Sequence, residues 1–160
     1  MTYVNSDYGK GLSDSFGKAF QALGGTVTIS VPHETGKADY SAEVASMDSA
    51  GGDAMAVFGY VNQGGPGIMQ ASLDSGSFDK FILADGMYGD DLLTNVEGDL
   101  TGTFGTVPGT DSKGAATYAD MANAAGLKGS GPFTGESYDA AALLILSLIH
   151  ISEPTRLSTI

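Results

Sequence analysis

Two tyrosines and one aspartate are the side chains in this sequence whose types and positions best fit recognition of a small polar molecule. Tyr8, Tyr60 and Asp85 each follow or end a segment with strand-like composition. A tyrosine offers an apolar ring face and a hydroxyl group, and a carboxylate is a charge partner for an ammonium group. Each also has a simpler interpretation, since Tyr8 could pack at a helix start and Asp85 could cap a helix or form a turn. Together they favour non-covalent binding.

The sequence offers little for covalent chemistry. It contains no cysteine and two histidines, and it lacks a P-loop, a dinucleotide-binding glycine motif after a strand, and a Gly-x-Ser-x-Gly elbow. His33 follows a predicted strand and is interpreted as a surface residue rather than a base or ligand. The acidic group Asp85, Asp90 and Asp91 does not have calcium-loop spacing. We therefore expect no enzyme, no metal site and no cofactor.

The charge balance limits the partners. Seven Lys and Arg residues stand against 19 Asp and Glu residues, which gives a formal net charge of -12. Such a surface repels phosphate backbones and anionic lipids, so we expect no nucleic-acid partner. No window approaches the roughly 18 apolar residues of a membrane span, so we expect no membrane insertion.

Strand-like and helical patterns alternate along the chain. Strands are predicted at 3–4, 26–31 (ending before Pro32), 54–60 and 81–84, with an extended segment at 103–107. Helices are predicted at 8–23, from 40 to about 50, at 67–73, near Leu92, at 112–125 and at 138–146. This alternation predicts an α/β fold, a Rossmann-like parallel sheet flanked by helices. Ligands bind such sheets beyond the carboxyl ends of the strands, where Tyr8, Tyr60 and Asp85 are expected to meet.

Several short motifs, taken in order, resemble the leucine/isoleucine/valine-type periplasmic substrate-binding proteins of ABC transporters. The resemblance spans about residues 3–145 and rests on the ordered set, because each motif is short. Residues 5–12 (NSDYGKGL) are similar to the Asp-x-Tyr-Gly-x-Gly opening of that family's second lobe. The others are 37–41 (KADYS), 58–60 (FGY), 70–71 (QA), 84–86 (ADG), and 131–133 (GPF) followed by 138–140 (YDA).

The resemblance implies roles for four side chains. Tyr8 and Tyr60 match tyrosines that line the family's cleft, and Asp85 matches the acidic residue that takes the ligand's ammonium group. Phe133 matches an aromatic residue near the ligand side chain. The sequence departs from the pattern where Asp85 replaces a frequent glutamate. It also departs at Gln63, Gly64, Gly65 and Gly67, where bulkier residues are expected, so the ligand's identity stays open.

The resemblance also predicts the organisation of the chain. Residues 1–105 are expected to form the carboxyl-side ligand-binding lobe of a type I periplasmic-binding-protein fold, which is incomplete here. Residues 106–145 are expected to contain a hinge crossing near 106–108 and helices belonging to a missing first lobe. Residues 146–160 resemble a translated sequencing adapter and are interpreted as a tail. A signal peptide is expected to precede the missing lobe, and this fragment alone is expected to bind no ligand usefully.

The function implied is the solute-binding component of an ABC importer. It would bind an amino acid or similar small polar solute reversibly in an interlobe cleft, as a periplasmic monomer, and deliver it to a membrane permease. An alternative is the ligand-sensing ectodomain of a receptor or regulator with the same fold, which a downstream transmembrane or DNA-binding segment would reveal. A small α/β enzyme is the third hypothesis, and it would require a positioned nucleophile or base.

Overall fold

The computed structural model describes residues 1–109, 112–127, 131 and 133–152. The chain divides into two compact units, residues 1–107 and residues 108–160. None of the helices in the described ranges is long and apolar enough to cross a membrane. The division falls after Val107, and the assignment of the second unit to another lobe stays a prediction.

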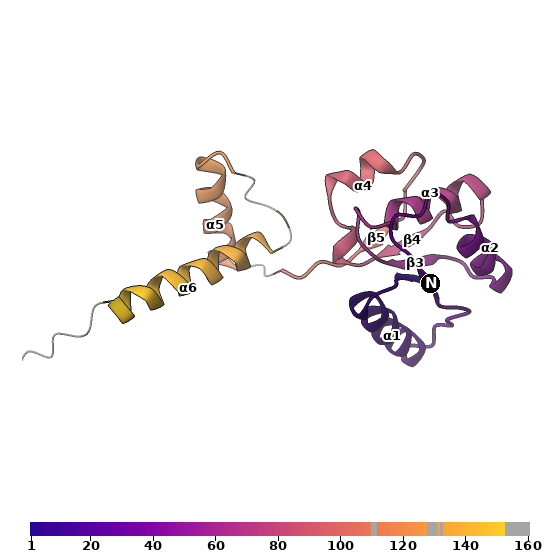
Figure 1. The fold of residues 1–160 in the computed structure, drawn as a ribbon, viewed down its shortest axis with the longest axis horizontal. Helices are drawn as coiled ribbons and strands as arrows, with labels where there is room; N and C mark the ends of the chain where they lie inside the picture. Colours follow the sequence, from indigo (N-terminus) through magenta and orange to yellow (C-terminus); the bar gives the residue numbers. More distant parts are fainter. Residues whose placement is uncertain (110–111, 128–130, 132, 153–160) are drawn as a thin grey trace, which may run out of the picture. The chain divides into compact units, whose positions relative to one another are not determined.

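The first unit is built on five parallel strands in the order β2-β1-β3-β4-β5. The strands are β1 (Thr2–Val4), β2 (Val31–His33), β3 (Met55–Phe58), β4 (Phe81–Leu83) and β5 (Phe104–Gly105). The helices are α1 (Asp7–Ala22), α2 (Ser41–Ala50), α3 (Gly65–Ser75), the 3-10 turn η1 (Asp85–Met87) and α4 (Asp90–Asn95). Figure 1 shows α1 on one face of the sheet and α2 and α3 on the other. The predicted α/β fold with a helix-flanked parallel sheet is confirmed.

The main core lies between the sheet and helices α2 and α3. All four residues of β3 are buried, because both faces of this central strand are covered. Val57 joins the core with Val44 of α2 and Ile68 of α3, whereas Phe58 meets the Phe16 ring of α1 at 5.2 Å. Full burial of each such side chain contributes roughly 1.5–3 kcal/mol. This two-sided burial explains why the segment reads as a continuous apolar run.

The predicted strand at 26–31 is wrong in position. The structure places β2 at Val31–His33 and includes Pro32, which lies opposite Tyr3 in β1. Proline lacks an N–H, but β2 is an edge strand, where one missing donor is tolerated. Thr2, the first residue of β1, pairs with Val31. The register with β1 therefore places the ladder at Val31–His33 rather than at 26–30.

The remaining predicted elements exist, with shifted ends. Ser6 caps α1 by accepting a hydrogen bond from the Gly9 amide, and α2 ends at Gly51, whose φ of 73° is left-handed. Helix α3 is longer than the predicted 67–73, and β3 is shorter than 54–60. The predicted extended segment at 103–107 forms only the two-residue strand β5.

The second unit contains two described helices, α5 (Lys113–Ala124) and α6 (Thr134–Ser152). Ser112 caps α5 by accepting from the Ala115 amide over 3.1 Å. The rings of Tyr118 and Tyr138 lie 5.2 Å apart and join the two helices. Helix α6 begins before and ends after the predicted 138–146, so the ends of that prediction are wrong. Residues 153–160 of the predicted tail lie outside the described residues.

Candidate functional site

Tyr8 is held at the sheet edge by the abrupt start of α1. The helix begins three residues after β1 ends, and Ser6 Oγ accepts from the Gly9 amide at 3.2 Å. Gly9 packs directly on Val4, since a Cβ atom there would lie 2.2 Å from the Val4 carbonyl oxygen. The absence of a side chain at Gly9 thus lets the first turn of α1 rest on the end of β1. Tyr8, the second residue of the helix, follows the carboxyl end of that strand.

Tyr60 lies in the loop that joins β3 to α3. Its carbonyl oxygen accepts hydrogen bonds from the amides of Gln63 at 3.1 Å and Gly65 at 3.3 Å. A Cβ atom on Gly65 would meet Met87 Sδ at 2.2 Å, and one on Gly67 would meet the Tyr40 ring at 2.7 Å. Small residues are therefore required where the resemblance led us to expect bulkier ones.

Asp85 begins η1, directly beyond β4, and its loop is locked to the loop of Tyr60. The Val61 amide donates to the Gly86 carbonyl over 3.0 Å. Gly86 has no room for a side chain, because a Cβ atom there would lie 2.3 Å from the Gly59 carbonyl oxygen and 2.8 Å from Tyr60 Cδ1. The two loops thus form one packed platform at the carboxyl edge of β3 and β4.

The three side chains meet at this edge. The Tyr8 hydroxyl donates to Asp85 Oδ1 over 2.8 Å, and the Tyr8 and Tyr60 rings stack with their centroids 4.8 Å apart and an interplanar angle of 24°. All three are partly exposed. The expected meeting of Tyr8, Tyr60 and Asp85 on one edge of the sheet is confirmed, and we refer to them as the edge cluster. Their contact with a ligand stays a prediction.

The electrostatics of the edge cluster keep Tyr8 protonated. Burial raises the pKa of the Tyr8 hydroxyl, and the hydrogen bond to Asp85 and the negative charge of that carboxylate raise it further, while the Gly86 backbone acts in the opposite direction. Tyr8 is therefore a neutral donor that orients the carboxylate. A carboxylate has about four lone-pair sites, so Asp85 keeps acceptor capacity for a cationic group after binding Tyr8.

An apolar groove of about 530 Å³ is lined by residues of β4, η1, α4 and β5, but not by Asp85 itself. Its lining includes Ala84, Met87, Leu93 and Phe104. Apolar walls beside a few convergent polar groups are the usual composition of a small-molecule site. Through Ala84, the residue before Asp85, the groove adjoins the segment that carries the carboxylate.

Phe133, the fourth predicted site residue, belongs to the second unit rather than to the edge cluster. Its side chain is 45% exposed, and its backbone has a φ of 62°. This left-handed conformation is uncommon for a residue other than glycine. A role for Phe133 near a ligand side chain stays a prediction.

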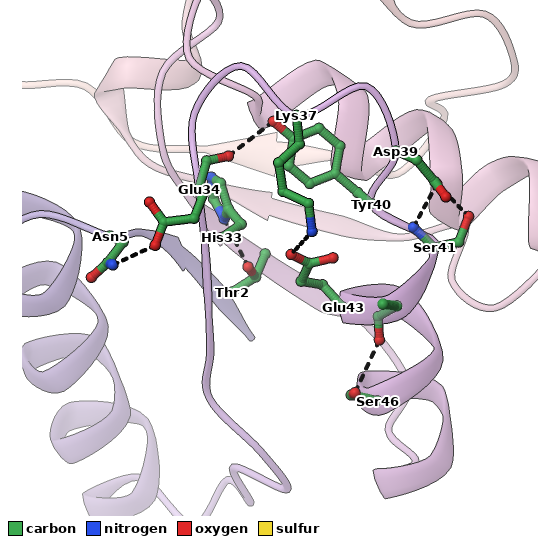
Figure 2. Close-up of polar contacts among 11 residues, drawn as sticks. Thr2, Asn5, His33, Glu34, Lys37, Asp39, Tyr40, Ser41, Glu43 and Ser46 are labelled. Atoms are coloured by element: carbon green, nitrogen blue, oxygen red, sulfur yellow. Dashed lines mark hydrogen bonds and ion pairs between the residues drawn. The ribbon is translucent and has the colours of Figure 1, made fainter.

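Asn5 and Glu34 extend the polar edge and were missed in the sequence. Figure 2 shows the Asn5 Nδ2 group donating to Glu34 Oε1, over 2.6 Å, in an exposed position. Asn5 follows β1 and Glu34 follows β2, so both lie at the carboxyl ends of strands. Tyr8 was selected because it follows the end of a strand. The same criterion selects Asn5 after β1, and Glu34 after β2 once that strand is placed at Val31–His33.

His33 was predicted to lie at the surface, and this is wrong. It ends β2 and its side chain is 0% exposed. Its Nδ1 atom lies 2.8 Å from Thr2 Oγ1 in the adjacent strand (Figure 2). Burial lowers the pKa of the His33 imidazole to about 4, outweighing the attraction of Glu43 and Glu34, which acts in the opposite direction. The residue is thus a neutral core histidine beneath the polar edge.

An open parallel sheet with polar and aromatic side chains converging at its carboxyl edge defines the α/β class of ligand-binding domains. Among the described residues, no group of three or more His, Cys, Asp or Glu side chains is placed to hold a metal ion. Residues 1–160 match the family described as periplasmic binding protein, and the chain belongs to that family. Membership assigns it to a class of extracytoplasmic proteins that bind small molecules. No curated protein matches the chain.

Proposed function

We propose that this chain contributes the edge cluster to the solute-binding component of an ABC importer. The protein binds an amino acid or a similar small polar solute reversibly, without covalent chemistry, and delivers it to a membrane permease. It acts in the periplasm as a monomer. Asp85 pairs with the ammonium group of the solute, and Tyr8 and Tyr60 form an aromatic wall with hydroxyl partners. Phe133 contributes an apolar contact.

The observation that carries this proposal is the 2.8 Å hydrogen bond from Tyr8 to Asp85, combined with the stacking of Tyr8 on Tyr60. It fixes the orientation of a partly exposed carboxylate at the sheet edge where small ligands bind in this architecture. A preoriented carboxylate recognises an ammonium group with less loss of side-chain freedom than a mobile one. The adjoining apolar groove suits an aliphatic side chain.

The test is a nuclear magnetic resonance titration of the isotope-labelled chain with L-leucine and with its keto acid, which lacks the ammonium group. Because the chain alone is expected to bind without useful affinity, the titration runs to high solute concentration and compares weak binding. L-leucine is expected to shift the amide signals of Tyr60 and Gly86, and the keto acid is expected to shift them at least tenfold more weakly at the same concentration. Asp85→Asn keeps the shape and removes the charge, so it is expected to weaken L-leucine binding by roughly tenfold or more, since hydrogen bonds to charged groups contribute about 1.5–3 kcal/mol.

The matched control is Asp79→Asn. Asp79 is exposed and precedes β4, whereas Asp85 follows β4. The two variants therefore each remove one negative charge, but at opposite ends of that strand. Asp79→Asn is expected to leave the titration unchanged. Equal effects of the two variants, or equal binding of the keto acid, would contradict the assigned role of Asp85.

A further inference from the structure

A buried imidazole lies beneath the loop that carries Tyr60. His33 is fully buried, its Nδ1 atom lies 2.8 Å from Thr2 Oγ1, and its Nε2 atom is buried without a hydrogen-bond partner among the described residues (Figure 2). A neutral imidazole carries one N–H. With the hydrogen on Nδ1, the ring donates to Thr2 and leaves Nε2 as a bare acceptor, which is the tautomer we infer from the bonding. The ring therefore fits this site as a neutral group.

The edge of the ring that carries Nε2 faces Gly59, at the start of the Tyr60 loop. A Cβ atom built on Gly59 would lie 3.1 Å from His33 Nε2, 3.4 Å from Cε1 and 3.9 Å from the Gly65 Cα atom. Gly59 immediately precedes Tyr60, and the Gly65 amide donates to the Tyr60 carbonyl. The imidazole thus lies against the backbone just before Tyr60, and Gly59 in turn lies close to Gly65, where the loop meets α3.

Charged groups lie near His33, and one of them, Glu43, has a buried Oε2 atom without a hydrogen-bond partner among the described residues. Glu34 follows His33 in the chain, and Glu43 of α2 is paired with Lys37 over 2.5 Å (Figure 2). Tyr40 presents its ring edge-on, with centroids 6.2 Å apart. After β3 the ring lies beside Gly59, which carries no charge.

Protonation changes what this site can accommodate. A second N–H at Nε2 is a charged donor, and a buried charge without a hydrogen-bond partner is strongly unfavourable. The attraction of Glu43 and Glu34 raises the pKa of His33, but burial lowers it more, to about 4. Because Nε2 is buried, water can reach it only if the surrounding structure moves, and Gly59 lies beside it.

We propose that His33 is a positioning residue for Tyr60, and that its protonation displaces residues 59–65 and opens the edge cluster. Tyr60 then leaves its stacked position on Tyr8, and Gly86, which packs on the Tyr60 ring, loses its cover. The movement of the loop requires no ligand. Its consequence, weaker solute binding in acid, rests on the proposed function.

The test is a pH titration of the ligand-free chain followed by nuclear magnetic resonance. The chain has two histidines, and the spectrum of His33→Asn identifies the His33 signal by its loss. We expect the Cε1 proton of His33 to titrate near pH 4, and the amide signals of Gly59 and Gly65 to shift with the same midpoint. The Gly76 amide, at the far end of α3, is the internal control and is expected not to follow that midpoint.

The His33→Asn variant distinguishes a loop movement caused by protonation of His33 from a response of the loop to acid that does not depend on His33. The asparagine amide replaces the Nδ1 atom towards Thr2 but does not titrate in this range, so the shifts of Gly59 and Gly65 are expected to disappear. Three results would each overturn the proposal. The His33 signal could titrate near its ordinary pKa of 6.5, or the Gly59 and Gly65 amide signals could fail to shift with the His33 midpoint. In the third case, all amide signals would collapse together at that midpoint, which indicates global unfolding. The pH titration uses the ligand-free chain, so its result would stand even if the chain bound no L-leucine.

Discussion

The Tyr8 hydroxyl donates a hydrogen bond to Asp85 Oδ1 over 2.8 Å, although the two residues are 77 positions apart in the chain. The bond joins the first turn of α1 to η1, and the Tyr60 ring stacks against the donor. Three segments that are separate in sequence, the start of α1, the β3–α3 loop and η1, thus share one small polar and aromatic cluster. The cluster therefore contributes both to the stability of the first unit and to the shape of the candidate site.

Replacing Tyr8 with phenylalanine is expected to destabilise the chain by about 1 kcal/mol. The substitution keeps the ring and removes the donor, and Asp85 is partly exposed, so water replaces part of the lost hydrogen bond. Urea unfolding of the two proteins measures the difference. Tyr88→Phe is the control, because Tyr88 is 58% exposed and its loss of a hydroxyl is expected to change stability by less than about 0.5 kcal/mol. Equal stabilities of Tyr8→Phe and the wild type would show that the bond contributes little.

The raised pKa of Tyr8 predicts a late phenolate signal in alkaline titration. The chain has seven tyrosines, and the difference in ultraviolet absorbance between the wild type and Tyr8→Phe isolates one of them. Tyr8 is expected to ionise well above the ordinary tyrosine pKa of 10.0, because burial and Asp85 oppose a second negative charge. The folded-state pKa lies above the unfolded value, so the stability from this bond is present below about pH 10 and is lost as the pH rises. Ionisation of Tyr8 near the ordinary pKa of 10.0 would contradict the hydrogen bond.

The edge cluster can be predicted from the sequence because each of its three residues is identified by its position at the end of a predicted strand. A parallel α/β pattern fixes which strand ends share an edge, so Tyr8, Tyr60 and Asp85 need only be assigned to strand ends. The misplaced strand at 26–31 shows where this logic fails. Val27, Ile29 and Val31 alternate as in a strand, but strand pairing depends on where β1 lies, and β1 pairs with Val31–His33. Asn5 and Glu34 were missed for the same reason.

The burial of His33 depends on packing that no local pattern contains. Its environment combines Thr2 of β1, Tyr40 at the start of α2 and the backbone of Gly59 after β3. Only a partner such as Thr2, brought alongside by the sheet register, makes a polar ring acceptable in the core. The glycines of the Tyr60 loop depend likewise on contacts with Tyr40 and Met87, which are remote in sequence.

Gly86→Ala is expected to destabilise the first unit by about 1–3 kcal/mol, as overpacking typically does. Its Cβ atom would lie 2.3 Å from the Gly59 carbonyl oxygen, so the Tyr60 and Asp85 loops must separate. Gly11→Ala is the matched control, because Gly11 lies in α1 with no atom within 4 Å of the added carbon. That change is expected to stabilise the helix by about 0.5–1 kcal/mol. Thermal unfolding that shifts both variants in the same direction would contradict the tight contact of the two loops.

Acid is expected to weaken the fold through His33, in a pH range set by its two pKa values. The folded-state pKa of about 4 lies below the ordinary value of 6.5, so the unfolded chain binds a proton that the folded chain excludes. The stability that depends on neutral His33 is therefore fully present above pH 6.5 and is lost as the pH falls towards 4. The difference between these values corresponds to on the order of 3 kcal/mol.

Urea unfolding of the wild type and His33→Asn from about pH 7.5 to about pH 4.5 measures this loss across the range between the two pKa values. The asparagine side chain of the variant does not titrate in that range, and all carboxylates are common to both proteins, so their contribution cancels in the comparison. The free energy of unfolding of the wild type is expected to fall relative to that of the variant as the pH falls. If the difference between the two free energies stayed constant with pH, the imidazole would be in contact with water in the folded state. Gly59→Ala would add a Cβ atom 3.1 Å from Nε2 and keep the ring buried, so it is expected to leave the direction of this pH dependence unchanged.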